Sequence, residues 1–489
     1  MKTNLLLIST LLALATGGCA IGPNYQSPNV SAPAQWSAAL AGGETNAPVP
    51  PAAWWENFHD AELNALISCA VSANLDLQIA QARVREARAQ YGIAVANFLP
   101  TADASGSCAR TETSHHQPVL GSLPIPAGVP FDNDVYQAGF DAAWEIDVFG
   151  GTRRAAQSAG AEVAAAQFER RAVLVTLLGE VARNYVDVRG FQRRLAITRE
   201  NIEAQSRALA ITRDRLAKGL TSDLDVQQAA ALLATTQAEV PALETSLQAA
   251  IHRLGVLLGR EPGALLAELS APAPIPAVPP VVPAGLPADL LLRRPDVQRA
   301  GRKLAADTAN IGVAQADLFP KFFLTGASGF ESVSTSDWFT AGSRFWSAGP
   351  TVQWRIFDAG RIRANIRVQN ARQEQALAAY EQTVLTAFEE VENGLTAYAN
   401  EQIRRRSLAE AVTASQKSLG LANRLYANGL TDFLHVLDAE RSLYQAQDAL
   451  VQSDRTVSAD LVSLYKSLGG GWQTVESQTT VALTKTQFR

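Results

Sequence analysis

The chain repeats itself at a constant spacing of 210 residues, and this repeat limits the folds that it can adopt. The matching positions include Trp144 and Trp354, Ile146 and Ile356, Gly150 and Gly360, Arg153 and Arg363, Gly219 and Gly429, Leu224 and Leu434, and Ala229 and Ala439. One spacing kept over so many positions without a gap indicates an internal duplication. We expect each copy to hold a strand, a very long helix, a tight turn and a returning helix.

The long helix follows from composition. From Gly151 to about residue 218 the chain lacks proline and is rich in Ala, Arg, Glu, Gln and Leu, which favour helix. About 66 residues at about 1.5 Å each give a rod of about 100 Å. Apolar residues step by four, three and four at Leu174, Leu178, Val181 and Tyr185, and again at Val384, Phe388, Val391 and Leu395. This spacing predicts a coiled-coil seam, although an ordinary helical bundle gives the same spacing.

Before each long helix the sequence alternates strictly between apolar and polar residues. Tyr136, Ala138, Phe140, Ala142, Trp144 and Ile146 share one face, as do Trp346, Ala348, Pro350, Val352, Trp354 and Ile356. An apolar face with aromatic rings at both ends, opposite a polar face, is typical of a transmembrane β-barrel. The alternative is an amphipathic hairpin of a soluble protein, which rarely has aromatic residues at both ends. Pro350 predicts a bend or bulge.

Strand number has a consequence for assembly. Each copy supplies two strands, so one chain has four, and four strands cannot close around a lumen. Open strand edges are not tolerated in lipid, so the chain must oligomerise. Three chains would give twelve strands, within the usual range for such barrels.

A weaker match at a spacing of 220 residues lies ahead of these strands. It links Ala94, Phe98 and Pro100 to Ala314, Leu318 and Pro320. The first copy therefore carries extra residues in the Pro- and Gly-rich loop between its two strands.

The N-terminus predicts export. Lys2 is followed by an apolar core and the small-residue stretch ATGGC, as in a signal peptide. This end resembles a bacterial lipobox, with Cys19 as the lipidated first residue of the mature chain. A plain signal peptide is the alternative. After this segment no run of 18 apolar residues follows, so a membrane role would use strands.

Composition excludes several functions. The net charge is −5 and no basic tract is present, which gives no sign of nucleic-acid binding. Cys69 and Cys108 fall in different predicted elements, and two free, buried thiols are favoured over a disulfide. The five His residues have no metal-ligand spacing, and no nucleophile elbow or phosphate-binding loop is present. We expect no enzyme, no cofactor and no metal. A periplasmic coiled-coil adaptor is a structural alternative, but its strands would not carry lipid-facing girdles.

The predicted segments are as follows. Residues 1–18 are a signal peptide and 19–53 a lipidated tether. The first repeat, 54–270, has strands at about 101–113 and 134–148, a long helix at 151–218 and a return helix at 222–258. A Pro-rich linker at 271–288 precedes the second repeat, 289–472, with strands at about 321–331 and 345–357, a long helix at 361–427 and a return helix at 432–468. Residues 473–489 are a C-terminal tail.

A set of motifs in this order resembles the outer membrane factors, the TolC/OprM-like exit ducts of Gram-negative bacteria. The motifs are CAIGPNYQSP, WWENFHDAEL, WEIDVFG, GLPADLLLRRPDV, WRIFDAGR and YANGLTDFLHVLDAERSL. The resemblance covers nearly all of the mature chain and is strongest to the lipoprotein branch that serves RND pumps. It implies a homotrimer with a 12-stranded β-barrel in the outer membrane, continued by an α-helical barrel in the periplasm. It also implies passive conduction from an inner-membrane RND-type pump through a periplasmic adaptor. The alternative is a type I protein-secretion channel, which usually lacks a lipid anchor.

The resemblance also implies roles for particular residues. The periplasmic gate would consist of Leu434, Asp438, Tyr426, His435 and Asp225. The adaptor would dock on the two tips, Gly219, Leu220 and Thr221, and Gly429, Leu430 and Thr431. The membrane girdle would be Tyr136, Trp144, Trp346 and Trp354. Each has an ordinary alternative: Asp438 as an acid at a helix start, Leu434 as a seam residue, and the glycines as turn residues.

Overall fold

The computed structural model describes residues 20–38, 43–45, 47, 53–112, 114, 132–279 and 281–474. The chain forms two compact units. We call Met1–Pro28, Arg85–Ala165 and Gly301–Ala379 the strand unit, and Asn29–Val84, Ala166–Ala300 and Tyr380–Arg489 the helical unit. Each unit takes segments from both sequence repeats, so the units cut across the repeats rather than following them.

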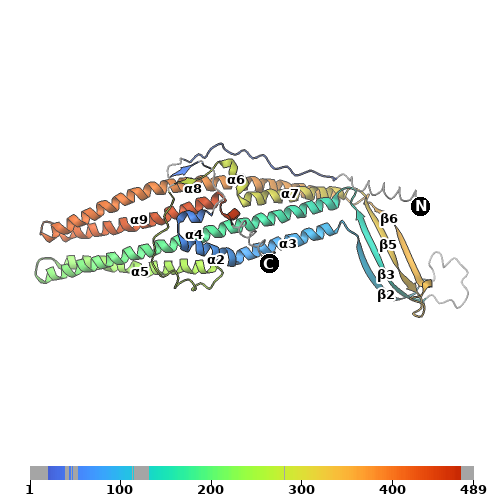
Figure 1. The fold of residues 1–489 in the computed structure, drawn as a ribbon, viewed down its shortest axis with the longest axis horizontal. Helices are drawn as coiled ribbons and strands as arrows, with labels where there is room; N and C mark the ends of the chain where they lie inside the picture. The colour runs from blue at the N-terminus through green and yellow to red at the C-terminus, as the bar shows by residue number, and fades with distance from the viewer. Residues whose placement is uncertain are drawn as a thin grey trace, which may run out of the picture. The chain divides into compact units, whose positions relative to one another are not determined.

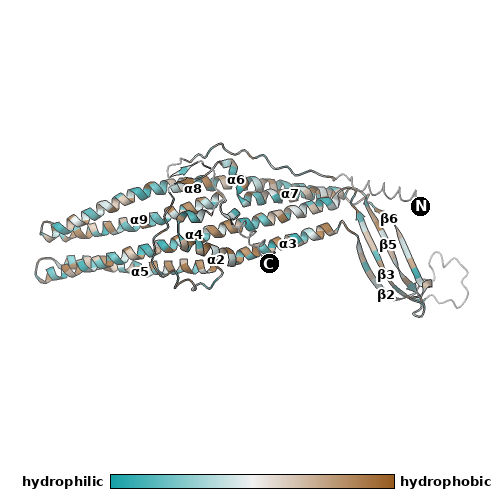
Figure 2. Cartoon of the chain, in the orientation of Figure 1, coloured by the Kyte–Doolittle hydropathy of each residue, from teal (hydrophilic) through white to brown (hydrophobic). Residues whose placement is uncertain are grey.

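The strand unit is built on one antiparallel sheet of four strands in the order β2-β3-β5-β6 (Figure 1). The strands are β2 (Thr101–Glu112), β3 (Asp132–Ile146), β5 (Lys321–Ser332) and β6 (Arg344–Gln353). Pairing across the sheet puts Trp144, Leu324 and Pro350 in one row. Apolar and polar residues are mixed along each strand, as alternation between two faces requires (Figure 2). None of the described strand residues in this sheet is buried.

The bulge expected at Pro350 is not present. The pairing of β5 with β6 runs without interruption from Lys321↔Gln353 to Phe330↔Arg344, with Leu324 opposite Pro350. Because β6 is an edge strand of this sheet, the missing N–H of proline can face away from β5. The ladder is therefore continuous where the proline residue stands.

The two strand–helix junctions of this unit have related contacts. The indole N–H of Trp144 donates to the carbonyl of Phe98 at 2.8 Å, and that of Trp354 donates to Leu318 at 3.1 Å. Phe98 and Leu318 follow α3 (Leu75–Ala96) and α7 (Pro295–Ala316). The matching tryptophans of the two repeats thus fix matching helix ends. Trp354 lies beyond β6, so this strand ends earlier than the expected 345–357.

The chain forms two helical hairpins of equal dimensions, which belong to the helical unit apart from the starts of their long helices, up to Ala165 and Ala379. Helices α4 (Gly151–Ala217) and α8 (Arg361–Ala427) have 67 residues each, and α5 (Asp223–Leu257) and α9 (Phe433–Ser467) have 35 each. Within this unit α5 returns along α4 and α9 along α8 (Figure 1). The shorter elements are the 3-10 helix η1 (Trp54–Phe58), α2 (Ala61–Ala73) and α6 (Pro287–Arg293).

The main core of the helical unit lies where these elements meet. The seam residues Leu178, Tyr185, Val391 and Leu395 are buried in it together with Trp54 of η1. The hydroxyl of Tyr185 donates to the carboxylate of Asp60 at 2.8 Å, while Asp60 caps the first turn of α2. The apolar seam of the long helices is thus covered by α2 and η1.

One helical stretch, Ala61–Ala96, is long and apolar enough to cross a membrane by length and composition. It consists of two helices that Asn74 separates, since Asn74 has extended backbone angles and its side chain accepts from Leu77. Leu63, Ile67 and Ala70 of its first half are buried in the main core. A core helix passes the same test, and that is the role of α2 here.

The segment expected as a tether is packed where it is described. Trp36 is buried in the helical unit and donates its indole N–H to Gly285 at 2.8 Å. The backbone N–H groups of Ser37 and Ala38 donate to the carboxylate of Glu392 at 2.7 and 2.9 Å. The short strand β1 (Glu44–Thr45) pairs with β4 (Val282–Pro283) of the Pro-rich linker. Both the N-terminal segment and the linker are therefore fixed to the helical unit at these points.

Candidate functional site

The tip of the first hairpin is closed by a glycine and a side-chain cap. Gly219 has a φ of 73°, and the N–H of Leu220 donates to the carbonyl of Arg215 at 2.9 Å. This is a Schellman motif, which needs a left-handed residue at the position of Gly219. Ser222 then caps α5, and Asp225 returns the bond in a capping box.

The carboxylate of Asp225 is used within this tip. It accepts from the hydroxyls of Thr221 and Ser222 and from the N–H of Ser222. The hydroxyl of Thr221, followed by the bonds from Ser222, lowers the pKa of Asp225 below its usual value. Asp225 is therefore ionised at neutral pH, and in this chain it contacts its own turn rather than Leu434 or Asp438.

The tip of the second hairpin has the same turn but a different cap. Gly429 has a φ of 71°, and the N–H of Leu430 donates to Leu425 at 2.9 Å. Asp432 occupies the cap position of α9 without a side-chain hydrogen bond to it. His435 stands where the first tip has Asp225, so an imidazole replaces the carboxylate that completes the box.

Exposed leucines mark both tips. Leu220 and Leu430 are 63% and 73% exposed, and Leu224 and Leu434, one turn further on, are 64% and 50% exposed. These residues are pairs in the sequence repeat, so each hairpin presents the same two apolar side chains. Exposed leucines at matching places favour contact with another protein surface.

Behind the leucines the two hairpins pack against each other. Leu209 of α4, Val226 of α5, Ala422 of α8 and Phe433 of α9 belong to one buried cluster. Tyr426 lies at its edge, with its ring centroid 5.2 Å from that of Phe433. The predicted gate residue Tyr426 is thus a packing contact between the end of α8 and the start of α9.

A groove runs beside the second tip. It has a volume of about 500 Å³ and is lined by residues of α8, α9 and the turn, both polar (Ser415, Ser418, Thr431, His435, Asp438 and Ser442) and apolar (Leu421, Ala422, Leu425 and Ala439). Asp438 and Leu434 are four residues apart, so they share a face of α9, and both are exposed. Arg441 lies 3.9 Å from the carboxylate of Asp438, with both side chains exposed, so this pair holds Asp438 weakly. The structure brings His435 and Asp438 together on this groove and leaves Asp225 in the other tip.

Two buried polar side chains near the tips have no signal in the sequence. Glu440 of α9 is 8% exposed, and one of its carboxylate oxygens has no hydrogen-bond partner among the described residues. Both amide atoms of Gln205 of α4 are buried, likewise without a partner in the part of the chain that the structure describes. Burial raises the pKa of Glu440. The sequence does not predict the burial of either residue, because burial depends on which helix packs against that face.

The expected girdle residues lie at different levels of the sheet. Tyr136 pairs near the distal end of β3, opposite Ser332, while Trp346 is opposite Ser328, four residues inward along β5. Trp144 and Trp354 bind the helix ends at the opposite end of the strands. Trp338 and Phe339 of the β5–β6 connection stack on each other at 4.8 Å, and Trp338 contacts Tyr136 at 5.5 Å. These two rings extend the distal aromatic row and were not predicted, because they lie in a loop without alternation.

The remaining sequence predictions concern the three cysteines and metal binding. Cys19 lies outside the described residues. Cys69 and Cys108 are free thiols, but the expectation that both are buried is wrong: Cys69 is half-buried, and Cys108 is exposed because it lies on β2, none of whose residues is buried. Within the described ranges no group of three His, Cys, Asp or Glu side chains is placed to hold a metal ion.

Comparison with known proteins decides the family. The sequence profile described as "Outer membrane efflux protein" matches residues 66–260 and 286–470, which is most of the chain. The chain belongs to the outer membrane efflux protein family. Members of this family are channel proteins of the outer membrane with a periplasmic helical part, and this chain serves as an exit duct for efflux. Each of the two matched segments covers most of one sequence repeat.

Individual relatives agree over nearly their whole length. The outer membrane protein OprJ of Pseudomonas aeruginosa is 34% identical over 463 residues, which is 94% of this chain and 95% of OprJ. The solvent efflux pump outer membrane protein SrpC of Pseudomonas putida is 34% identical and covers 96% of this chain and 99% of its own. Among solved structures, the outer-membrane channel OprN is similar with a TM-score of 0.87 and 37% identity, over 93% of this chain and 100% of OprN. The outer membrane efflux fold is thus present from the first repeat through the second.

Proposed function

We propose that this chain forms a homotrimeric exit duct, with a 12-stranded barrel to which each chain gives β2, β3, β5 and β6. The main support for this proposal is the four-stranded sheet. Large apolar side chains such as Phe140 and Trp346, on one face, are 71% and 78% exposed. Soluble proteins rarely leave such an apolar face uncovered, whereas lipid covers it in a membrane barrel.

The opposite face suits a water-filled lumen. It carries Gln137, Asp141 and Glu145 of β3 and Thr325 and Glu331 of β5. The edge strands β2 and β6 leave their outer hydrogen-bonding groups unpaired within one chain. Since lipid does not tolerate such edges, each β6 would pair with β2 of a neighbouring chain.

The oligomeric state tests this proposal. Light scattering of the detergent-solubilised, folded protein is expected to give the mass of three chains. A monodisperse monomer that keeps its strand content would overturn it, because four strands cannot form a closed barrel.

We further propose that the tips dock a periplasmic adaptor that connects the duct to an RND-type inner-membrane pump. The exposed pairs Leu220 with Leu224 and Leu430 with Leu434 support it, because they lie on short turns at the ends of both hairpins. A photo-cross-linking residue at Leu430 is expected to capture the adaptor in cells. The same residue at Leu292, which is 76% exposed on α6, is the control. Equal capture at both positions would argue against docking at the tips.

The gate is proposed at the second tip. Three copies of Leu434 and Asp438 would form an apolar ring beside an acidic ring at the periplasmic end of the pore. The exposure of both residues and the groove at Asp438 support this assignment. Lipidation of Cys19 is proposed on the sequence alone.

A further inference from the structure

The connection between β5 and β6 is folded against the distal end of the sheet. The hydroxyls of two residues in this turn donate to the carbonyl of Asp337 at 2.8 and 2.6 Å, which fixes the turn. The ring of Trp338 lies against that of Tyr136 of β3. The ring of Phe339 contacts that of Phe330 of β5, with centroids 5.5 Å apart. These four rings form one cluster beside the first residue of β6.

The pairing of the strands decides which face of the sheet this cluster covers. Phe330 lies opposite Arg344 of β6, and Ser328, two residues further along β5, lies opposite Trp346. Residues directly opposite each other, and every second residue along a strand, share one face of a sheet. Arg344 and Trp346 thus share the face of Phe330, which is the apolar face assigned to lipid in the proposed barrel. Arg344 is exposed on this face.

Arg344 differs in its level from the other charged residues on this face. In the described strands these others are Arg110, Glu112, Asp132 and Asp134. All four lie further out than Tyr136 in the pairing of β2 with β3, and Arg110 has an ion pair with Asp132. Tyr136 is opposite Ser332 on β5, whereas Arg344 is opposite Phe330, two residues further in. The guanidinium of Arg344 has no hydrogen bond or ion pair with any described residue, so a positive charge stands among aromatic rings on the lipid side without a counter-charge from this part of the chain.

We propose that Arg344 binds the phosphate of an anionic membrane lipid, whose acyl chains lie on the apolar face of the sheet beside Trp346. The inference rests on the proposed barrel, in which this end of the strands is the end away from α3 and α7, at the outer surface of the membrane. The cost of a lipid-facing arginine is largest at the middle of a bilayer and falls towards its surface, where aromatic rings also gather. The planar guanidinium donates two parallel hydrogen bonds to a phosphate, so a lipid headgroup supplies the counter-charge that the described residues do not give to Arg344.

Lipid binding to the detergent-solubilised trimer tests this site, with phosphatidylglycerol as the probe and native mass spectrometry as the measurement. Arg344→Gln is expected to weaken binding about tenfold, because the charged hydrogen bonds to the phosphate are lost. Arg344→Lys is expected to restore part of the binding, since lysine keeps the charge without the planar fork. Arg355→Gln is the matched control, because Arg355 is also exposed but lies past the other end of β6. Unchanged binding in Arg344→Gln, or an equal loss in Arg355→Gln, would overturn the proposal.

Two further measurements distinguish this site from its alternatives. Glycerol phosphate, which has the headgroup chemistry without acyl chains, is expected not to displace the lipid at equal concentration, and displacement would overturn the assignment to a lipid. In the proposed trimer, Glu112 of the neighbouring chain is the rival counter-charge. A loss of thermal stability in Arg344→Gln with lipid binding intact would favour that rival and overturn the proposal. Light scattering tests the duct separately, since a monomer refutes the barrel, whereas a trimer that keeps its lipid without Arg344 refutes only this site.

Discussion

The guanidinium carbon of Arg215 lies 4.4 Å from the ring centroid of Tyr426, and the two residues come from different repeats. Nη1 of Arg215 also donates to the carbonyl of Tyr426 at 3.4 Å. A cation held over an aromatic face contributes about 0.5–2 kcal/mol, more when water is excluded. The contact therefore joins the end of α4 to the end of α8, next to the groove assigned to the gate.

This contact predicts different effects for two changes at Tyr426. The buried hydroxyl of Tyr426 has no hydrogen-bond partner within the described residues, so Tyr426→Phe should leave thermal stability the same or slightly higher. Tyr426→Ala removes the ring from both Arg215 and Phe433 and should lower stability by about 2 kcal/mol or more while raising single-channel conductance. Bilayer recordings and melting curves of both variants measure this. A phenylalanine variant that opens as much as the alanine variant would show that the hydroxyl matters after all.

The gate assignment predicts a change in conduction. Leu434→Ala combined with Asp438→Ala should raise single-channel conductance and reduce preference for cations, because the apolar and acidic rings are both removed. Leu224→Ala in the first tip is the control, since Leu224 is the exposed repeat partner of Leu434. An unchanged conductance in the double variant would place the gate elsewhere.

The tip glycines predict a loss of efflux without a loss of trimer. Gly219→Val or Gly429→Val forces a β-branched residue to a φ near 70°, which strains the turn by about 1–2 kcal/mol or more. Asparagine tolerates this conformation, so Gly219→Asn and Gly429→Asn separate strain from surface contact. Drug accumulation in cells and trimer content of the membrane are the measurements. Normal efflux in both valine variants would reject the tips as the docking site.

A cavity in the helical unit predicts a pH effect on stability. Asp460 lines a cavity of about 610 Å³ together with Arg294, Glu390 and Lys466. Burial, with a smaller contribution from Glu401, raises the pKa of Asp460 from 3.8 to about 6, and Arg183 opposes this. The folded state thus binds this proton more tightly than the unfolded state. The resulting stability is present below about pH 3.8 and is lost as the pH rises through about 6.

Asp460→Asn should therefore stabilise the protein at pH 8 by about 1–2 kcal/mol, after allowance for partial exposure. The gain should shrink towards zero at pH 4. Melting temperatures of both proteins across this range provide the measurement. A gain of the same size at pH 4 and pH 8 would mean that ionisation of Asp460 is not its cause.

Much of the fold can be predicted from the sequence, because many of its elements are determined by residues that are close together in the chain. The helix α4 ends at Ala217, one residue before the expected end at residue 218. The prediction is this close because the glycine that closes the turn is visible in the sequence itself. Alternation likewise marks β3 and β6, since it needs only neighbouring residues. The alternation of β6 continues to Ile356, whereas the pairing of β6 with β5 ends at Gln353, so alternation alone does not fix where the strand ends. Of the bend or bulge expected at Pro350, the bulge is absent, because the proline can turn its missing N–H away from β5, the one strand of this chain that pairs with β6 among the described residues.

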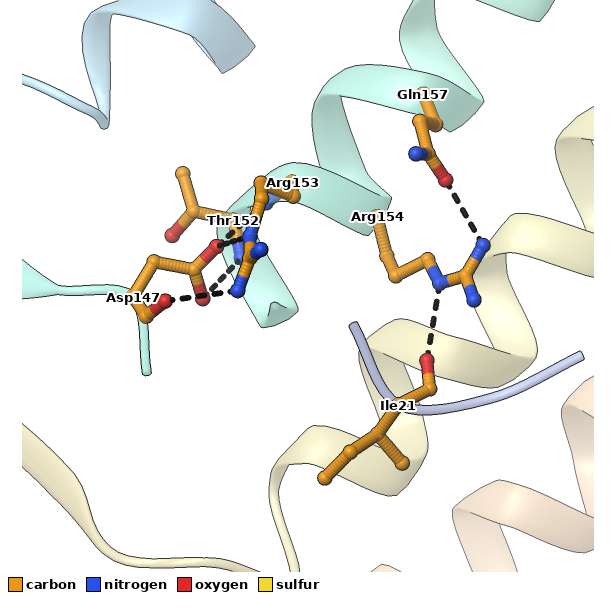
Figure 3. Close-up of polar contacts among 6 residues, drawn as sticks. All are labelled: Ile21, Asp147, Thr152, Arg153, Arg154 and Gln157. Atoms are coloured by element: carbon orange, nitrogen blue, oxygen red, sulfur yellow. Dashed lines mark hydrogen bonds and ion pairs between the residues drawn. The ribbon is translucent and has the colours of Figure 1, made fainter. Parts of the chain in front are cut away.

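The candidate functional site is harder to predict from the sequence, because its contacts depend on partners that are distant in the chain. Glycines and exposed leucines of the tips stand out in the repeat, but Arg215 was not predicted, because its partner Tyr426 comes from the other hairpin. The burial of Glu440 depends on the helices packed around it. The hydrogen bond from Arg154 to the carbonyl of Ile21 joins residues 133 positions apart (Figure 3), and no periodic pattern in the sequence indicates such a contact.

The difference between the two helix caps has a consequence for the symmetry of the proposed trimer. Three chains would bring six hairpin ends to the periplasmic mouth, alike in length and turn. Three would be closed by the Ser222–Asp225 box and three, with Asp432 and His435, would not. Such a cap contributes about 1 kcal/mol to holding the first turn of a helix. The six hairpin ends would therefore look alike, but the mouth would respond with three-fold symmetry. The three hairpin ends without a capping box would move first.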